Sequence, residues 1–217
     1  MTIPRLLALA LGAVLLSAAA LAHQEHSGDQ FASERPAQPP LIRSGKDKGT
    51  PDARSYFTDT LLLDQNGRQL RFYSDVLRNR VVLLNVIYTK CEDACPLITS
   101  RLKEVRHALG SQANNVYFIT LTSDPKNDTP EVLKAYARKH GVDKRNWIFL
   151  TGGEEQLAVV LSRLGMPTLH PRSPQEHSTM LIAGDVANRH WTKIRPDAEP
   201  KAIAQHLQLM TMPVAGR

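Results

Sequence analysis

Cysteine is almost absent from this chain of 217 residues, which contains only Cys91 and Cys95. Neither follows the apolar run at the N-terminus directly, so a lipid-modified N-terminal cysteine is excluded. A structural zinc site normally takes four protein ligands, and no further cysteine is present to complete one. Three interpretations remain for two cysteines that are separated by three residues and followed by Pro96: a structural disulfide, a redox couple or part of a metal site.

Runs of one charge and internal repeats are absent as well. The 27 Lys and Arg residues and the 21 Asp and Glu residues give a formal net charge of +6 and are interleaved along the chain. Such a mixture is typical of a solvated surface and argues against a nucleic-acid-binding protein. At most, the mildly basic balance favours docking to acidic partners or to anionic lipid surfaces.

The N-terminus has the features of a secretory signal peptide. Arg5 precedes an apolar run that ends in Ala20-Leu21-Ala22, a good cleavage site. The run is at the short limit of the ~17–25 residues that a membrane-spanning helix needs. We therefore expect residues 1–22 to be removed, with a retained membrane anchor as the alternative. The product would be exported to the periplasm, an oxidising compartment in which a free thiol pair is prone to form a disulfide.

The rest of the chain divides into a tether and one domain. Residues 23–52 are rich in Gln, Ser, Pro, Lys and Gly and show almost no apolar periodicity, which predicts a flexible tether. His23 and His26 in this tether could hold a metal ion weakly. Residues 53–212 are expected to form a single domain of ordinary size.

Turn signals and apolar patterns divide this domain into strands that alternate with helices. Asn66-Gly67 between two strand-like runs predicts a hairpin, and the unalternating apolar run at 81–88 predicts a strand that is covered on both faces. Alternation of this kind predicts an α/β fold with a central, mainly parallel sheet, helices on both faces and an antiparallel edge. Strands are expected at 57–63, 69–73, 81–88, 116–121, 147–150, 180–183 and 190–194, and helices at 96–109, 130–140, 154–164 and 200–210.

The cysteine pair is expected just beyond the carboxyl end of strand 81–88, where ligands and chemistry collect in open α/β sheets. Pro96 disfavours the α conformation for the residue before it, which predicts Cys95 at the N-cap rather than inside the helix. A single turn supplies the separation that a disulfide needs and could equally aim both sulfurs at one metal ion. A disulfide that closes so short a loop adds little stability. A functional pair is therefore favoured, but the spacing does not separate redox chemistry from metal binding.

A third ligand would favour metal binding. Thiolates suit Cu(I) and imidazole suits both copper states, so the eight histidines are the residues to consider. His177 directly precedes an apolar strand and is the first candidate, and His170, flanked by prolines in a loop, is its possible substitute. The other histidines in the domain are interpreted as surface or packing residues: His107, His140, His190 and His206.

Taken in order, these segments resemble the Sco/SenC family of thioredoxin-fold copper-binding proteins that assemble cytochrome c oxidase. The resemblance covers residues 56–207, nearly all of the expected domain. It rests on the Asn66-Gly67 hairpin, Cys91-x-x-x-Cys95-Pro96, Thr122-Ser123-Asp124-Pro125 followed by Asp-Thr-Pro-Glu-Val-Leu at 128–133, Trp-Ile-Phe-Leu-Thr-Gly at 147–152, and Glu176-His177-Ser178 ahead of a strand. The family typically has Asp at the position of Glu176, and the segment from Asp197 onward follows its pattern less closely.

The resemblance implies a thioredoxin-like fold and a copper site made of Cys91, Cys95 and His177, with Asp124 in a neighbouring loop as a candidate for orienting the site. It implies a metallochaperone that delivers copper to a respiratory copper enzyme, with the copper A site of cytochrome c oxidase as the expected recipient. Metal binding would be gated by the redox state of the cysteine pair. The implied partners are a subunit of that enzyme and an upstream thiol reductant or copper donor.

Three other classes stay open at this point. A thiol-disulfide oxidoreductase that reduces the cysteines of the recipient's copper site would need only Cys91 and Cys95. A thiol peroxidase is disfavoured, because Thr89 lies two rather than three residues before Cys91 and the proline expected of such enzymes is absent. A non-enzymatic interaction module would keep the pair as an inert disulfide.

Overall fold

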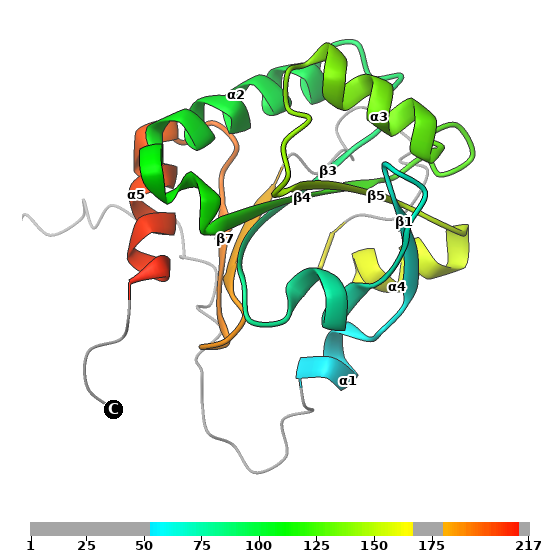
Figure 1. Ribbon diagram of the computed structural model, residues 1–217, viewed down its shortest axis with the longest axis horizontal. Coiled ribbons are helices and arrows are strands. Elements are labelled where there is room, and N and C mark those ends of the chain that lie inside the picture. Colours follow the sequence, from blue (N-terminus) through cyan, green and yellow to red (C-terminus); the bar gives the residue numbers. More distant parts are fainter. Residues whose placement is uncertain (1–52, 167–179, 213–217) are drawn as a thin grey trace, which may run out of the picture. The chain divides into compact units, whose positions relative to one another are not determined.

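A seven-stranded mixed sheet organises the protein, as seen in a computed structural model that describes residues 53–166 and 180–212. The expected signal peptide, the tether, His170 and His177 lie outside the described residues. The strand order is β2-β1-β5-β4-β3-β6-β7 (Figure 1). The strands are β1 (Leu61–Asp64), β2 (Gln69–Arg71), β3 (Val81–Ile87), β4 (Val116–Thr122), β5 (Trp147–Thr151), β6 (Leu181–Asp185) and β7 (His190–Ile194).

The centre of the sheet is parallel and its two sides are antiparallel. β3 pairs with β4, and β4 with β5, in parallel. β1 pairs antiparallel with β5 and β2, and β6 pairs antiparallel with β3 and β7. The α/β class with an N-terminal hairpin and an antiparallel edge is confirmed, and parallel pairing is confined to the three central strands.

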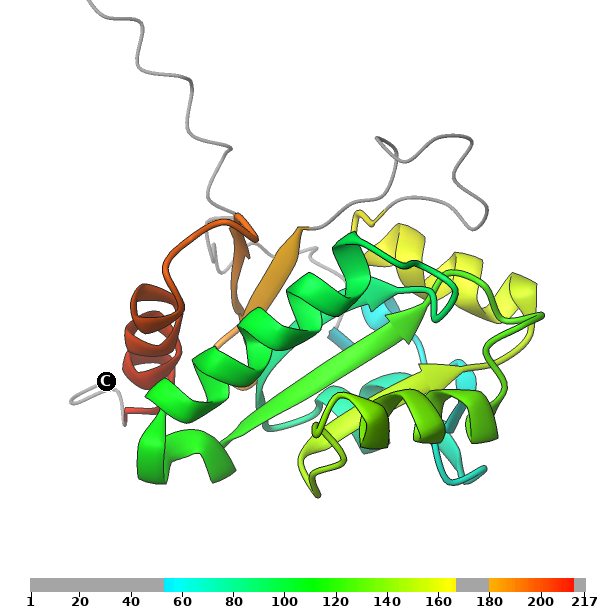
Figure 2. The same cartoon turned by 90° about the horizontal axis from the view of Figure 1, so that it is seen from above.

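Helices cover both faces of this sheet. The helices α2, α3 and α5 lie on one face, and α1 and α4 lie on the other (Figure 1). Seen from above, α2 and α3 lie over the central strands and α5 lies beside α2 (Figure 2). The bounds are α1 (Ala53–Phe57), α2 (Ala94–Ala108), α3 (Pro130–Lys139), α4 (Glu154–Arg163) and α5 (Pro200–Thr211), with a π-helix η1 (Phe72–Leu77) and a 3-10 helix η2 (Gly110–Asn114). None of these helices in the described part is long and apolar enough to cross a membrane.

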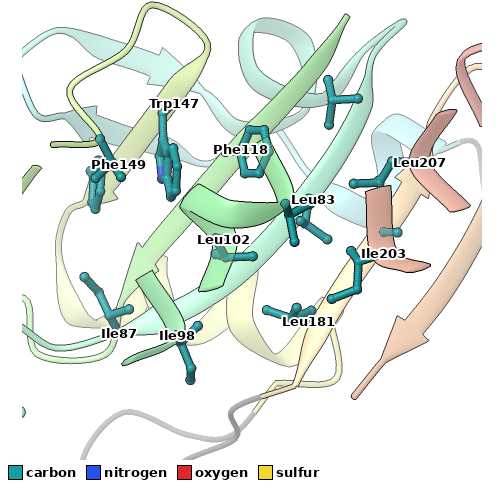
Figure 3. Packing of buried hydrophobic residues seen from close by; sticks show 14 of the residues in the cluster. Leu83, Ile87, Ile98, Leu102, Phe118, Trp147, Phe149, Leu181, Ile203 and Leu207 are labelled. Carbon is teal, nitrogen blue, oxygen red and sulfur yellow. The ribbon is translucent and has the colours of Figure 1, made fainter. Parts of the chain in front are cut away.

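Alternate residues of the central strands face two separate cores. Side chains of β3 alternate between the faces of the sheet, so Leu83 and Ile87 join one core while Val82 and Leu84 join the other. We call the core under α2, α3 and α5 the cysteine-side core, because it includes both cysteines; Figure 3 shows part of it. We call the core under α1, η1 and α4 the hairpin-side core.

The hairpin turn forms where the sequence predicts it. Gly67 has a φ of +75°, a left-handed conformation that glycine adopts without strain. The carboxylate of Asp64 accepts hydrogen bonds from the backbone amides of Asn66 at 2.8 Å and Arg68 at 2.9 Å, which holds the turn closed.

Both outer ends of the predicted hairpin were wrong. Phe57, predicted in a strand, is the last residue of α1, and Tyr73 lies in η1 rather than in a strand. Phe72, Val76 and Leu77 are all fully buried, and a single helical turn places these three apolar side chains against the hairpin-side core. The apolar residues at the end of the second predicted strand therefore belong to the helical turn η1 that follows β2.

Candidate metal site

The segment between β3 and α2 carries both cysteines. β3 ends at Ile87, Cys91 lies in the connection, and α2 begins at Ala94. The prediction that Cys95 is the N-cap was wrong, because the N-cap is Asp93 and Cys95 is the second residue of the helix. Pro96 is tolerated next to it because the amide groups of a first helical turn need no partner inside the helix.

The two thiols lie against one another across a single turn. The backbone amide of Cys95 donates to the sulfur of Cys91 at 3.3 Å, and the amide of Cys91 donates to the carbonyl of Tyr88 at 3.1 Å. Both side chains are buried, with 9% of Cys91 and 5% of Cys95 exposed, and both are free thiols. The turn thus places two soft donors at one point of the structure, an arrangement suited to Cu(I) or to reversible disulfide formation.

The two thiols differ in acidity. Burial pushes the pKa of Cys91 upward, but hydrogen bonds with the amide and thiol of Cys95 and with Tyr88 outweigh it and leave the pKa below the ordinary thiol value. Burial raises the pKa of Cys95 to about 12. Burial, together with the hydrogen bond to Cys91, also raises the pKa of Tyr88 to about 12, so its hydroxyl stays protonated beside the sulfur. Cys91 is therefore the sulfur that ionises first.

A polar contact ties Cys95 to α3. The hydroxyl of Thr99, one turn along α2, donates to the carbonyl of Cys95 at 2.9 Å and lies 3.0 Å from the hydroxyl of Tyr136. Burial raises the pKa of Tyr136 to about 12, so it remains a neutral hydrogen-bonding group. The helix that carries Cys95 is thus fixed to its neighbour by hydrogen bonds inside an otherwise apolar core.

The loop between β4 and α3 lies beside the cysteine segment. Asp124, which the resemblance suggested for orienting the site, accepts both of its side-chain hydrogen bonds from Asn127, at 2.9 and 2.8 Å. Its role toward the cysteines stays a prediction. The sequence reasoning missed Asp128, which is fully buried and whose carboxylate accepts hydrogen bonds from Thr89 and Thr122. Its position just before Thr129-Pro130 is typical of the start of a helix, so nothing in the local pattern distinguishes it as a site residue.

The third ligand falls outside what the structure describes. Within residues 53–166 and 180–212, no group of three or more His, Cys, Asp or Glu side chains could hold a metal ion. His177 and His170 both lie in the undescribed range, so the predicted ligand set stays a prediction. The four described histidines have other places: His107 in the last turn of α2, His140 against Tyr136 at the end of α3, and His190 in β7 beside His206 of α5.

The fold and the site define a class: an α/β protein of thioredoxin-like architecture with a buried cysteine pair at the end of a central strand. The model of the SCO1/SenC family matches residues 48–211, and the chain belongs to this family.

Individual relatives agree with this assignment. The chain is 31% identical to the SCO2-like protein of Rickettsia felis over 157 residues, which are 69% of this chain and 74% of the relative. Its fold is similar to the structure of Bradyrhizobium japonicum ScoI with copper bound, with a TM-score of 0.58 and 24% identity over 70% of this chain and 96% of the other. It is also similar to BsSco, described as a member of the Sco family of cytochrome c oxidase assembly proteins with a disulfide switch, with a TM-score of 0.58 and 22% identity over 70% and 90% of the two chains.

Proposed function

We propose that this protein is an exported, periplasmic copper metallochaperone that binds one copper ion through Cys91, Cys95 and His177 and delivers it to a respiratory copper enzyme. The copper A site of cytochrome c oxidase is the proposed recipient, and the copper ion is cargo rather than a resident cofactor. The observation that carries the proposal is the pair of buried free thiols joined across one turn by the Cys95 amide. Membership of the SCO1/SenC family and the copper bound to a similar structure support it.

Chain geometry supports His177 as the third ligand. β6 runs antiparallel to β3, with Ile182 beside Leu84, so the chain enters β6 at the same edge of the sheet where β3 leads to Cys91. His177 lies four positions before Leu181, and four extended residues span at most ~14 Å. This short reach from the start of β6 supports His177 as the proposed third ligand.

We propose that the redox state of the pair gates copper binding. Forming the Cys91–Cys95 disulfide passes two electrons and two protons from the thiols to an oxidant, such as a second disulfide that is reduced to two thiols, and leaves no thiolate for the metal. An upstream dithiol that supplies two electrons and two protons, and itself becomes a disulfide, would break the Cys91–Cys95 bond and restore both ligands. The disulfide switch described for the similar protein BsSco supports this proposal.

A Cu(I) titration against a chromophoric competitor tests the ligand set. The reduced full chain is compared with His177→Ala and with the double variant Cys91→Ser/Cys95→Ser. We expect one tightly bound equivalent in the native protein and weaker binding in both variants. Binding that needs the cysteines but ignores His177 would move the third ligand elsewhere, with His170 tested next. Equal binding by the native protein and the double cysteine variant would refute the proposal.

The unequal acidity of the two thiols favours a second candidate, a thiol-disulfide oxidoreductase acting on the cysteines of the recipient copper site. Such an enzyme attacks with the more acidic thiol, here Cys91, and resolves the mixed disulfide with the other, Cys95. It requires no histidine ligand. Full reductase activity of His177→Ala toward a disulfide peptide, together with weak copper binding by the native protein, would favour this candidate.

A further inference from the structure

Asp128 is a buried carboxylate that no basic residue neutralises among the ion pairs of the described chain. Its oxygens accept hydrogen bonds from the Thr89 amide at 3.2 and 3.1 Å, from the Thr89 hydroxyl at 2.5 Å and from the Thr122 hydroxyl at 2.5 Å. Burying a carboxylate is unfavourable unless its oxygens are hydrogen-bonded, and these neutral donors supply that compensation. Packing alone does not explain a carboxylate at this position, because burying an acidic side chain is unfavourable.

The donors come from two different segments of the chain. Thr122 is the last residue of β4, next to Ile87 at the end of β3, while Thr89 lies two residues before Cys91. Asp128 therefore connects the rigid end of a central strand to the segment that carries the first cysteine. A second connection runs alongside it, from the Lys90 ammonium to the side-chain oxygen of Asn127 at 2.6 Å, but this one is exposed to solvent.

We propose that Asp128 is a positioning residue for Cys91: by fixing Thr89 to the end of β4, it holds the turn in which the two sulfurs meet. The copper part of this inference rests on the proposed function, whereas the disulfide part does not. Besides the contacts of Asp128, two hydrogen bonds shape the turn: the Cys91 amide donates to the Tyr88 carbonyl, and the Cys95 amide donates to the Cys91 sulfur. A looser turn lowers the effective concentration of one sulfur at the other, and so weakens anything that requires both.

Asp128→Asn is the direct test, because it keeps the shape and replaces one acceptor oxygen with a donor that opposes the Thr89 and Thr122 donors. The first readout uses the metal-free full chain in a glutathione buffer, where the Cys91 and Cys95 thiols and one oxidised glutathione exchange to the protein disulfide and two reduced glutathiones. We expect the equilibrium constant for disulfide formation to fall by about tenfold, and Cu(I) affinity to fall by a similar factor, as is usual for residues that orient metal ligands.

Two threonine variants separate positioning from stability and from charge. Thr89→Val removes the hydroxyl contact between Asp128 and the cysteine segment, and Thr122→Val removes the hydroxyl contact between Asp128 and β4. Both variants keep the Asp128 carboxylate. We expect Thr89→Val to lower the disulfide constant in the same direction as Asp128→Asn. Thr122→Val, which removes the link between Asp128 and β4, should lower the disulfide constant as well, and the free energy of unfolding of both variants is measured in urea to record any separate loss of stability.

These measurements distinguish a positioning role of Asp128 from a purely structural one. If Asp128→Asn lowers the free energy of unfolding but leaves the disulfide constant unchanged, Asp128 has a structural role only and the inference is overturned. If Asp128→Asn does not fold, the two threonine variants decide, and disulfide constants equal to that of the native protein in both would overturn the inference. If the native protein fails to bind Cu(I) through its cysteines, the proposed function fails, while the disulfide readout still tests Asp128.

Discussion

The two cores on either side of the sheet differ in chemistry although they share the same strands. In the hairpin-side core, the buried apolar cluster consists of aliphatic, aromatic and methionine side chains. The cysteine-side core contains both cysteines and Tyr136, and buried polar groups accompany it: the Thr120 hydroxyl donates to Asn85 at 2.8 Å and accepts from the Trp147 indole at 3.0 Å. One face of the sheet therefore holds the cysteine pair in addition to its apolar packing.

The pleat of the strands explains this division. Along β4, Phe118 belongs to the cysteine-side core and the following residue, Ile119, to the hairpin-side core. Thr120 and Thr122 repeat the two-residue period of Phe118, so their hydroxyls face the same side as the cysteines. Polar residues placed at every second position thus gather on one face without interrupting the apolar face behind them.

Matched cavities in the two cores should give the largest effect and test the comparison directly. Leu102 in α2 and Leu161 in α4 are each 1% exposed and belong to opposite cores. Leu102→Ala and Leu161→Ala should each lower the free energy of unfolding by roughly 2–5 kcal/mol, measured in urea. Only Leu102→Ala should also weaken Cu(I) binding in the folded protein, because the cavity lies under the helix that carries Cys95. Equal losses of copper affinity would show that the two cores are not independent.

The hairpin turn, far from the cysteines, should matter for stability alone. Asp64 is 1% exposed and also pairs with the Arg68 guanidinium at 2.6 Å. Asp64→Ala leaves two turn amides without their acceptor and should lower the free energy of unfolding by about 2 kcal/mol. Cu(I) titration of the folded variant should match the native protein, and a weaker affinity would contradict the separation.

The hydroxyl of Thr99 offers a smaller change within the cysteine-side core. Thr99→Val removes the hydrogen bonds to the Cys95 carbonyl and to Tyr136 while it keeps the shape of the side chain. We expect the free energy of unfolding to fall by about 1 kcal/mol, measured in urea. A several-fold loss of Cu(I) affinity should accompany it, whereas an affinity equal to that of the native protein would show that this contact does not hold Cys95 in place.

The smallest expected effect is a pH dependence from His206. Burial first, and then the neighbouring His190, lower the pKa of His206 in the folded protein. The unfolded chain then binds a proton at higher pH than the folded one, so this contribution to stability is complete above about pH 6.5 and is lost as the pH falls below that value. His206→Gln should therefore lose less stability between pH 7.5 and pH 5.5 than the native protein, by urea unfolding at both values. Equal losses would contradict the assignment.

The sequence predicted the centre of the fold better than its margins. The buried strands at 81–88 and 116–121 were found because unalternating apolar runs are typical of strands covered on both faces, and they form β3 and β4. The ends of the hairpin were missed because a helical turn and a strand can share the same apolar residues, as at Phe72. Local patterns indicate that a residue is buried, but they do not show whether it belongs to the strand or to the helical turn that follows.

The candidate site, too, could be predicted only where it depends on residues close together in the sequence. The cysteine pair could be placed at a strand end because the strand and the following helix are local in sequence. The contact of Asp128 with the cysteine segment could not be predicted, since Thr89 lies 39 residues away and local patterns do not record such contacts. The role of His177 stays a prediction that rests on the family resemblance and on the direction in which β6 enters the sheet.

The antiparallel pairing of β6 with β3 affects the order in which parts of the protein fold during synthesis. Val81 of β3 pairs with Asp185, so the strand that leads to Cys91 receives one of its two neighbours about a hundred residues later in the chain. Contacts between such distant segments form slowly, after the local helices and the β3–β4 pair. Because a chain is synthesised from its N-terminus, Cys91 and Cys95 are synthesised early but become buried late. A newly made molecule passes through an interval in which oxidants reach both thiols more easily than they do in the finished fold.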